Sequence, residues 1–233
     1  MAINAGPKIV EDGLIFCLDA ANPRSYPGAG TTWTDLTANK DNGSLINTPT
    51  FDDTDIKNFT FNGTNEYAQF TGAEVSYPFP YDVVTAILWV FPLSSNPKSN
   101  GTDCNLITIE NSWEISIGNR GNGYSKIHYA SNPWAWRGNG GNHLVNDQWN
   151  MLTFVHSLTD RKVYVDNQLM YTYNDTGALS SGESGSPYLR LMNRYCCGGS
   201  YAPGKLSYIM IYNRAISASE VLQNYNATKW RFQ

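Results

Sequence analysis

The last part of the chain constrains the fold most, because it predicts a buried strand that runs directly into a short helix. Apolar residues occupy both alternating sets between Leu206 and Tyr212, which indicates a strand covered on both faces. A helix is expected to begin at Ser217, because Glu220, three residues later, completes a capping box. The residues expected to be buried on this helix are Val221, Leu222 and Tyr225. The tail therefore predicts a β protein that ends in one short helix.

Short strand-like segments recur along the rest of the chain, and no earlier segment predicts a helix. Val83–Phe91 is apolar on both faces except at Thr85, so we expect it at the centre of a sheet. Trp113–Ile117 alternates between apolar and polar residues, which is typical of a half-solvated strand. The other expected strands are Leu14–Leu18, Phe59–Phe61, Tyr67–Phe70, Leu106–Glu110, Ile127–Ala130, Trp149–Ser157, Lys162–Asp166, Gln168–Tyr173 and Tyr188–Met192.

Three of these strands, from Trp149 to Tyr173, are expected to form a meander joined by tight turns. Asp166 and Asn167 both tolerate positive φ, as a two-residue type I′ hairpin demands. We expect this meander to form the centre of one sheet.

Composition indicates one globular domain and argues against some partners. The chain of 233 residues has 13% aromatic and only 15% charged residues, which is typical of a strand-rich globule. We expect a β-sandwich over residues 13–233, preceded by an N-terminal arm over residues 1–12 that serves as an attachment segment. The net charge of −4 and the scattered Lys and Arg argue against nucleic acid. No apolar run reaches membrane-spanning length and no signal peptide is visible, so we expect no membrane insertion and assembly in a cytoplasm.

The four cysteines do not form a disulfide framework for a chain of this size. Cys17 lies within an apolar strand and is expected to be a buried thiol. Cys104 lies in a loop and could pair with Cys196 or Cys197, which are adjacent in a Gly-rich turn. Unpaired thiols remain the alternative.

Four blocks of the sequence resemble one known family. They are GLIFCLDAANPRSYPGAGTTWTDLTANKDNGSLINTPTF, FNGTNEYAQF, DQWNMLTFVHSLTDRKVYVDNQLM and GKLSYIMIYNRAISASEVLQNYNATK. In this order they are similar to the laminin-G-like jelly rolls of the concanavalin A-like lectin/glucanase superfamily. In the second block Asn62 stands where the family usually has Asp. The resemblance covers roughly Gly13 to Lys229 and implies an all-β, two-sheet antiparallel β-sandwich with one short C-terminal helix.

The first block looks like the opening of laminin-G-like domains in structural proteins of tailed phages. That resemblance implies a virion protein, in a head decoration or tail-associated position, with other virion proteins as partners and with homo-oligomers expected. The scaffold itself does not fix a function, because it carries lectins, enzymes and structural modules.

Catalytic patterns are weak, and we expect a non-catalytic protein. The related glucanases place their carboxylates on one strand as Glu-x-Asp-x-x-Glu, and this string is missing. The nearest pair, Glu110 and Glu114, has a different spacing and is expected to face solvent. The three histidines select no serine partner for a catalytic triad.

A loop rich in Trp, Asn and Gly is the candidate carbohydrate site. Sugars stack on aromatic rings while amide, imidazole and guanidinium groups bond their hydroxyls. Packing at the sandwich end or against another subunit is the alternative explanation for its tryptophans. The candidate residues are Tyr129, Asn132, Trp134, Trp136, Arg137, Asn139 and His143.

Two further expectations concern metal and subunit contacts. Oxygen-rich loops over residues 35–42, 52–55 and 62–66 could hold Ca²⁺, although none has an EF-hand spacing. Trp230, beyond the expected helix, is a candidate for packing against a partner or the first strand.

Together these patterns predict a non-catalytic virion protein that displays a lectin-like sandwich able to bind host-surface or environmental glycans. A free-standing carbohydrate-binding lectin module and a polysaccharide-degrading enzyme are the alternatives.

Overall fold

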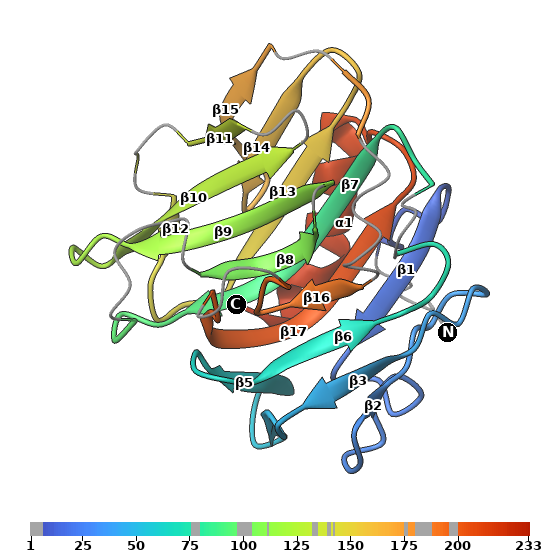
Figure 1. Cartoon of the computed structure of the whole chain (residues 1–233), viewed down its shortest axis with the longest axis vertical. Coiled ribbons are helices and arrows are strands. Elements are labelled where there is room, and N and C mark those ends of the chain that lie inside the picture. The colour runs from blue at the N-terminus through green and yellow to red at the C-terminus, as the bar shows by residue number, and fades with distance from the viewer. Residues whose placement is uncertain are drawn as a thin grey trace, which may run out of the picture.

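Two antiparallel β-sheets pack face to face, and a short helix covers the outer side of one of them (Figure 1). This architecture confirms the predicted all-β sandwich with one C-terminal helix. The structure, a computed structural model, describes residues 7–75, 80–96, 104–110, 112–131, 135–138, 141, 143–174, 177–179, 188–195 and 200–233, with the backbone alone for 119, 131 and 135–137.

The eight-stranded sheet has β7 and β17 at its centre, which confirms the central position predicted for Val83–Phe91. β1 and β5 share one edge of β17, because β1 pairs with residues 208–212 and β5 with residues 203–206. In spatial order the strands are β15 (Gln168–Tyr173), β14 (Arg161–Val165), β13 (Asn150–His156), β7 (Val84–Pro92), β17 (Pro203–Tyr212), β5 (Asn58–Asn62) and β4 (Thr50–Asp52), with β1 (Leu14–Asp19) beside β17.

The nine-stranded sheet lies in front of the first in Figure 1. Five of the strands in the two sheets were not predicted, and each is only two to four residues long: β2, β3, β4, β11 and β12. In spatial order the strands are β11 (Ala135–Arg137), β10 (Tyr124–Ser131), β9 (Trp113–Asn119), β8 (Asn105–Ile109), β16 (Leu189–Leu191), β6 (Tyr67–Phe70), β3 (Gly43–Ile46) and β2 (Thr32–Trp33), with β12 (Leu144–Val145) beside β10.

Two apolar cores explain why the central strands are apolar on both faces. In β17, Ile209 and Ile211 face the other sheet, whereas Tyr208, Met210 and Tyr212 face the helix. Each residue of the strand alternates between the two layers, so neither face meets water. The eight-stranded sheet is therefore the middle layer of the molecule.

Helix α1 (Ala218–Thr228) begins as predicted, followed by the 3₁₀ turn η1 (Lys229–Arg231). The Ser217 hydroxyl accepts the Glu220 N–H, and the Glu220 carboxylate accepts the Ser217 N–H at 2.7 Å. Val221 is buried, but Leu222 is 42% exposed, so its predicted burial was wrong. The buried face of the helix instead includes Asn224, whose Oδ1 accepts a hydrogen bond from the Val10 N–H at 2.8 Å.

The type I′ turn is confirmed, whereas the predicted place of the meander was wrong. Asp166 and Asn167 have φ of 47° and 69°. The meander forms one side of its sheet, with β15 at the edge, because the long strands β7 and β17 pair with each other and take the centre.

The described part of the expected N-terminal arm lies against the helix. The Lys8 carbonyl accepts the Gln223 side chain at 2.9 Å, and the Val10 carbonyl accepts the Tyr212 hydroxyl at 3.0 Å. Residues 8–12 are therefore docked on the sandwich. The role of the N-terminal arm in attachment stays a prediction.

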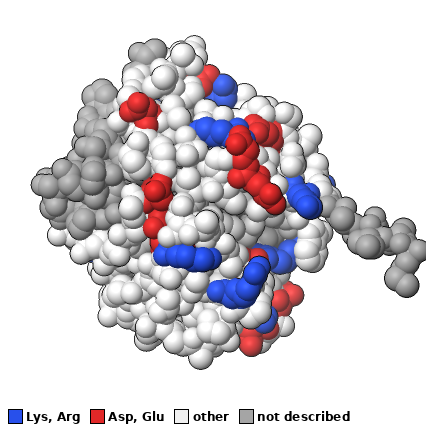
Figure 2. All heavy atoms as spheres, turned by 90° about the vertical axis from the view of Figure 1, so that its right-hand side faces the viewer, with Lys and Arg blue, Asp and Glu red and all other residues white. Residues whose placement is uncertain are grey.

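Charged side chains are mixed on the surface. On the face shown in Figure 2, basic and acidic groups lie side by side and most of the described surface carries neither. This face offers phosphate groups no continuous basic stripe. Among the described residues, no helix is long and apolar enough to cross a membrane.

Candidate functional site

The outward face of the nine-stranded sheet carries a group of polar and aromatic side chains. Tyr67 and Gln69 of β6 and Arg190 of β16 are only partly buried, while their neighbours along each strand lie in the core. Because strand residues alternate between faces, these three side chains belong to the outer surface. The register places Arg190 opposite Gln69, so the two strands present them side by side.

Arg190 is held in a fixed position on this face. Its guanidinium carbon lies 4.6 Å from the centre of the Tyr67 ring and 4.9 Å from that of Tyr195. Its Nη2 donates to Gln69 Oε1 at 2.9 Å, and its Nη1 donates to Asn193 Oδ1 at 2.9 Å. We call these five residues the Arg190 patch. Its parts come from two neighbouring strands and the segment that follows β16.

The charge of the Arg190 patch is not balanced within the described chain. Arg190 forms no ion pair there, and the groups that it contacts are neutral amides and phenol rings. Tyr195 is 45% exposed, so an aromatic ring is presented to solvent beside the guanidinium. An unneutralised guanidinium next to an exposed ring can bond a carboxylate or hydroxyls while the ring packs on an apolar surface.

A buried ionic cluster lies beside the Arg190 patch. Arg194 Nη2 is 2.7 Å from Glu110 Oε1, and Arg194 Nε is 3.3 Å from Glu114 Oε2. The two carboxylates have side-chain exposures of 2% and 0%. The expectation that they face solvent was therefore wrong. They point away from the apolar core and yet are shielded from water.

Burial perturbs this cluster. Desolvation raises the pKa of Glu114 to about 7, with Arg194 opposing the rise and Glu110 adding to it. Two carboxylates that share one guanidinium cannot both be fully neutralised. The Glu114 carboxyl is therefore expected to change from protonated to ionised near neutral pH.

Further buried polar atoms line the same face. Thr108 pairs with Glu114 in the register and Asn105 pairs with Ser116, which places all four on one face. The side-chain oxygens of Asn105, Thr108 and Ser116 have no hydrogen-bond partner among the described residues. The outward face of β9 is thus polar but buried. The predicted alternation of apolar and polar residues is confirmed, whereas the predicted exposure of the polar face to solvent was wrong.

Two residues of the predicted carbohydrate site are buried and serve other contacts. Tyr129 is fully buried, and its hydroxyl lies 2.8 Å from His156 Nδ1. His143 accepts the Ile127 N–H at 2.8 Å through its Nδ1, and burial lowers the pKa of its imidazole to about 4. Neither side chain is presented to a ligand in solvent, because the alternation of β10 turns Tyr129 into the core and the loop end folds His143 over β10.

The rest of that predicted site is described only in part. Trp136 and Arg137 belong to β11, whose backbone alone is described, and Trp136 stands opposite Ala130, itself opposite Glu114. Position 136 therefore lies in the same cross-strand row as Thr108 and Glu114. Asn132, Trp134 and Asn139 lie outside the described residues. Their role in carbohydrate binding stays a prediction.

The predicted Ca²⁺ loops use their oxygens on the backbone. Asp35 accepts the N–H groups of Cys17, Thr37 and Asp41, and Asn62 Oδ1 accepts that of Thr64. These bonds shape the turns. No group of three or more His, Cys, Asp or Glu that could hold a metal lies together in the described part of the chain. Calcium binding stays a prediction.

The cysteines are described in part. Cys17 is buried as predicted and its thiol lies 3.7 Å from the Tyr208 hydroxyl. Cys104 is also buried, against the Asn96 side chain. Its predicted partners Cys196 and Cys197 lie outside the described residues, so the pairing stays a prediction.

Comparison with known proteins identifies the family. A family model described as the concanavalin A-like lectin/glucanases superfamily matches residues 62–222. The chain belongs to this superfamily. The family assignment confirms the predicted resemblance, whereas the link to phage proteins stays a prediction. A comparison with curated protein sequences finds no match.

Solved structures share the fold at low sequence identity. The ligand-binding domain of botulinum neurotoxin serotype D, solved with N-acetylneuraminic acid, has a TM-score of 0.67 at 12% identity, over 93% of this chain and 51% of that one. Domain 4 of an extracellular arabinanase from Geobacillus stearothermophilus, solved with arabinotriose, has a TM-score of 0.66 at 16% identity, over 94% and 100%. The binding domain of Paraclostridial Mosquitocidal Protein 1 has a TM-score of 0.65 at 17% identity, over 92% and 52%. The present chain thus spans about half the length of the toxin chains and the whole length of the arabinanase domain.

The Arg190 patch escaped the sequence analysis, although its strands were expected. The alternation of Tyr67 and Gln69 with Ala68 and Phe70 indicates which residues face outward. Arg190 lies between two core leucines in the same way. What the sequence does not show is that the strands β6 and β16, far apart in the chain, are neighbours.

Proposed function

We propose that this chain is a non-catalytic carbohydrate-binding β-sandwich, and that the Arg190 patch contacts the glycan. The observation that carries the proposal is a guanidinium with no ion pair among the described residues, locked between two tyrosine rings, one of them 45% exposed, on the outer face of a sheet. Support also comes from fold relatives that were solved with N-acetylneuraminic acid and with arabinotriose.

The charge of Arg190 favours a glycan that bears a carboxylate, such as a sialic or uronic acid. A guanidinium bonds a carboxylate through two parallel N–H groups, which a neutral sugar cannot match. The Tyr195 ring then packs on the apolar side of the sugar. The remaining patch residues hold the guanidinium in place.

The buried cluster favours binding over hydrolysis. A retaining glycosidase needs one carboxylate free to attack the sugar and another to donate a proton. Here Glu110 and Glu114 share one arginine and have almost no exposed surface. We assign the two carboxylates a structural role, in which they hold Arg194 beneath the binding face.

A glycan array that contains neutral, sialylated and uronic-acid glycans tests the proposal. We expect acidic glycans to bind, and Tyr195→Ala to weaken the best binder about tenfold, as expected for truncation of an aromatic contact. Tyr124→Ala is the matched control, because Tyr124 is 37% exposed and lies on β10, away from β6 and β16. Equal binding by both variants would remove the Arg190 patch from the site.

The predicted loop is tested on the same array. If Trp134→Ala or Trp136→Ala abolishes binding while Tyr195→Ala does not, the glycan binds at the loop. Arg190→Lys keeps the charge but loses the planar fork, and is expected to reduce the preference for acidic over neutral glycans.

We also propose that the protein acts as part of a phage virion, which is supported by the resemblance of its opening block, residues 13–51. Mass spectrometry of purified particles tests this location. Absence of its peptides from particles that contain the other virion proteins would overturn it.

A further inference from the structure

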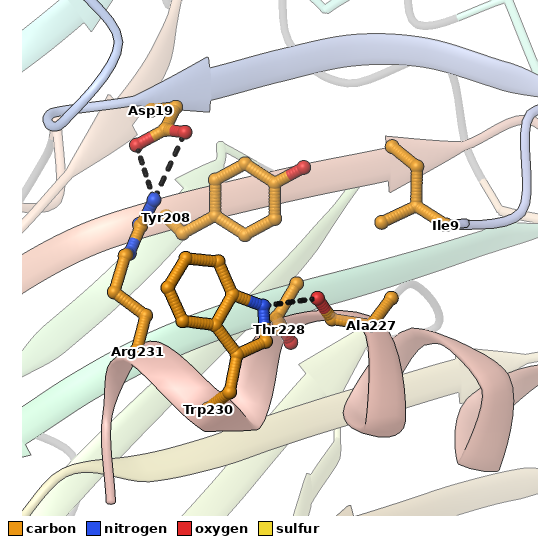
Figure 3. Close-up of a pocket in the computed structure, with 7 residues that line it drawn as sticks. All are labelled: Ile9, Asp19, Tyr208, Ala227, Thr228, Trp230 and Arg231. Atoms are coloured by element: carbon orange, nitrogen blue, oxygen red, sulfur yellow. Dashed lines mark hydrogen bonds and ion pairs between the residues drawn. The ribbon is translucent and has the colours of Figure 1, made fainter. Parts of the chain in front are cut away.

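A separate pocket lies on the far side of the eight-stranded sheet, between β1, β17 and the C-terminal segment (Figure 3). Its volume is about 170 Å³. That is close to the cavity of about 150 Å³ that accommodates one benzene ring. The pocket therefore has room for one six-membered ring. The Arg190 patch lies on the other sheet, so the two sites face in opposite directions.

Trp230 forms an open aromatic wall of this pocket. It is 75% exposed, the largest exposure among the exposed large apolar side chains of the described chain. Its indole N–H donates to the Ala227 carbonyl at 3.0 Å, which fixes the ring against the end of the helix. Figure 3 shows the indole next to Thr228, facing the same space as Tyr208. A ring held this way can accept a ligand without losing further rotational freedom.

A charged pair forms the polar end of the pocket. Arg231 Nη1 lies 2.9 Å and 3.0 Å from the two carboxylate oxygens of Asp19. The guanidinium is held over the Tyr208 ring, with its carbon 5.3 Å from the ring centre, and by the Ser207 hydroxyl at 3.2 Å. The side chains of Arg231 and Asp19 keep exposures of 21% and 17%. The carboxylate oxygens keep lone pairs that ligand hydroxyls can use.

The ligand that fits has an apolar face and hydroxyls on one ring. A pyranose offers its C–H face to Trp230 and its hydroxyls to the Asp19–Arg231 pair. An aromatic or proline side chain would fill the ring space but leave the charged end without bonds. The pair is already neutral, and Asp19 repels a second carboxylate, so the preferred sugar is uncharged.

We propose that this pocket binds one neutral pyranose ring, as a second carbohydrate site on the side opposite the Arg190 patch. The proposal rests on the proposed carbohydrate-binding function and extends it to a second sugar class. Two sites that face apart allow a single chain to bridge two glycans, or to bind one surface through either side. The affinity of a lone sugar ring is expected to be about millimolar.

The indole N–H signals in a ¹H–¹⁵N spectrum report on the pocket directly. Trp230→Phe identifies the Trp230 signal by its loss. The probes are the methyl glycosides of glucose, galactose and mannose, with glucuronic acid as the charged comparison. We expect at least one neutral glycoside to shift the Trp230 signal in a saturable way, and glucuronic acid to bind at least about tenfold more weakly, a difference that one lost charged contact can produce.

Variants show whether the pocket residues bind. Trp230→Ala is expected to weaken the neutral glycoside about tenfold or more, measured by ligand-detected NMR, and Trp230→Phe less, since it keeps an aromatic face. Leu222→Ala is the control, because Leu222 is 42% exposed on the same helix and is not part of the pocket lining. Asp19→Asn removes the charge that repels acidic sugars. It is expected to narrow the difference in affinity between the neutral glycosides and glucuronic acid.

The outcomes separate this proposal from the proposed function. If no neutral glycoside moves the Trp230 signal while the array shows binding that depends on Tyr195, the pocket proposal is overturned and the proposed function stands. If Trp230→Ala instead turns an oligomer into a monomer in sedimentation velocity, the pocket is a subunit contact and the proposal also fails. If glycosides bind at Trp230 but the array shows no dependence on Tyr195, carbohydrate binding belongs to the pocket alone.

Discussion

Replacing Glu114 by Gln isolates the energetic effect of one buried carboxyl. The side chain is 0% exposed, and Gln has nearly the shape of the protonated acid. Arg194 keeps its contact with Glu110 at 2.7 Å in this variant, so no guanidinium is left without a carboxylate. The substitution therefore removes one negative charge from the cluster while it preserves the packing.

The sign of the effect follows from the direction of the pKa shift. Burial raises the pKa of Glu114 from 4.5 in the unfolded chain to about 7 in the folded protein. The folded state thus holds this proton more tightly, and Glu114 lowers stability as pH rises through that interval. At about 1.36 kcal/mol per pH unit, the loss amounts to about 3 kcal/mol above pH 7.

Urea unfolding of both proteins between pH 4.5 and pH 8 measures this loss. We expect Glu114→Gln and the natural chain to be nearly equal at the acid end, with the variant more stable by about 3 kcal/mol at the alkaline end. Glu11→Gln, at an exposed position, controls for the chemical exchange itself and is expected to change stability by less than about 0.5 kcal/mol. A difference between variant and natural chain that does not change with pH would refute the reasoning.

Two further predictions concern the C-terminal helix and the middle layer. Ser217→Ala removes the hydroxyl that accepts the Glu220 N–H, and is expected to cost about 1 kcal/mol and to lower the Tm by about 3 °C, by calorimetry; an unchanged Tm would show that the cap adds nothing to the docked helix. Burial raises the pKa of the Cys17 thiol to about 12, so iodoacetamide is expected to spare it at pH 8 in the native protein and to label it in urea, by peptide mass mapping. Rapid native labelling of Cys17 would mean that β1 opens.

Much of the fold could be predicted because single segments carry strong local signals. The strand 206–212 and the capping box of Ser217 and Glu220 depend on neighbours within one element, and both were right. The type I′ turn at 166–167 depends on two residues with positive φ. The burial of Leu222 could not be decided in the same way, because the face of the helix that docks is chosen by contacts with β7 and with residues 8–10.

The candidate site was predicted less well, because its parts are far apart in the chain. Glu110 and Glu114 were expected in solvent, and only their pairing with Arg194, some eighty residues later, shows why they stay buried. Tyr129 is an aromatic residue of the kind that binds sugars, yet the register of β10 turns its side chain into the core. The Arg190 patch exists only because β6 and β16 are paired.

The sequence by itself determined the class of the protein: alternating apolar residues, turn residues and one capped helix permit little else than a β-sandwich with a C-terminal helix. These signals act between residues a few positions apart, so they can be read along the chain. The tertiary structure alone decided which outward faces meet solvent, which carboxylates share an arginine, and where Trp230 meets Asp19 and Arg231. Those features depend on which distant strands become neighbours, and pairing between distant strands is set by the packing of the whole core rather than by any local pattern.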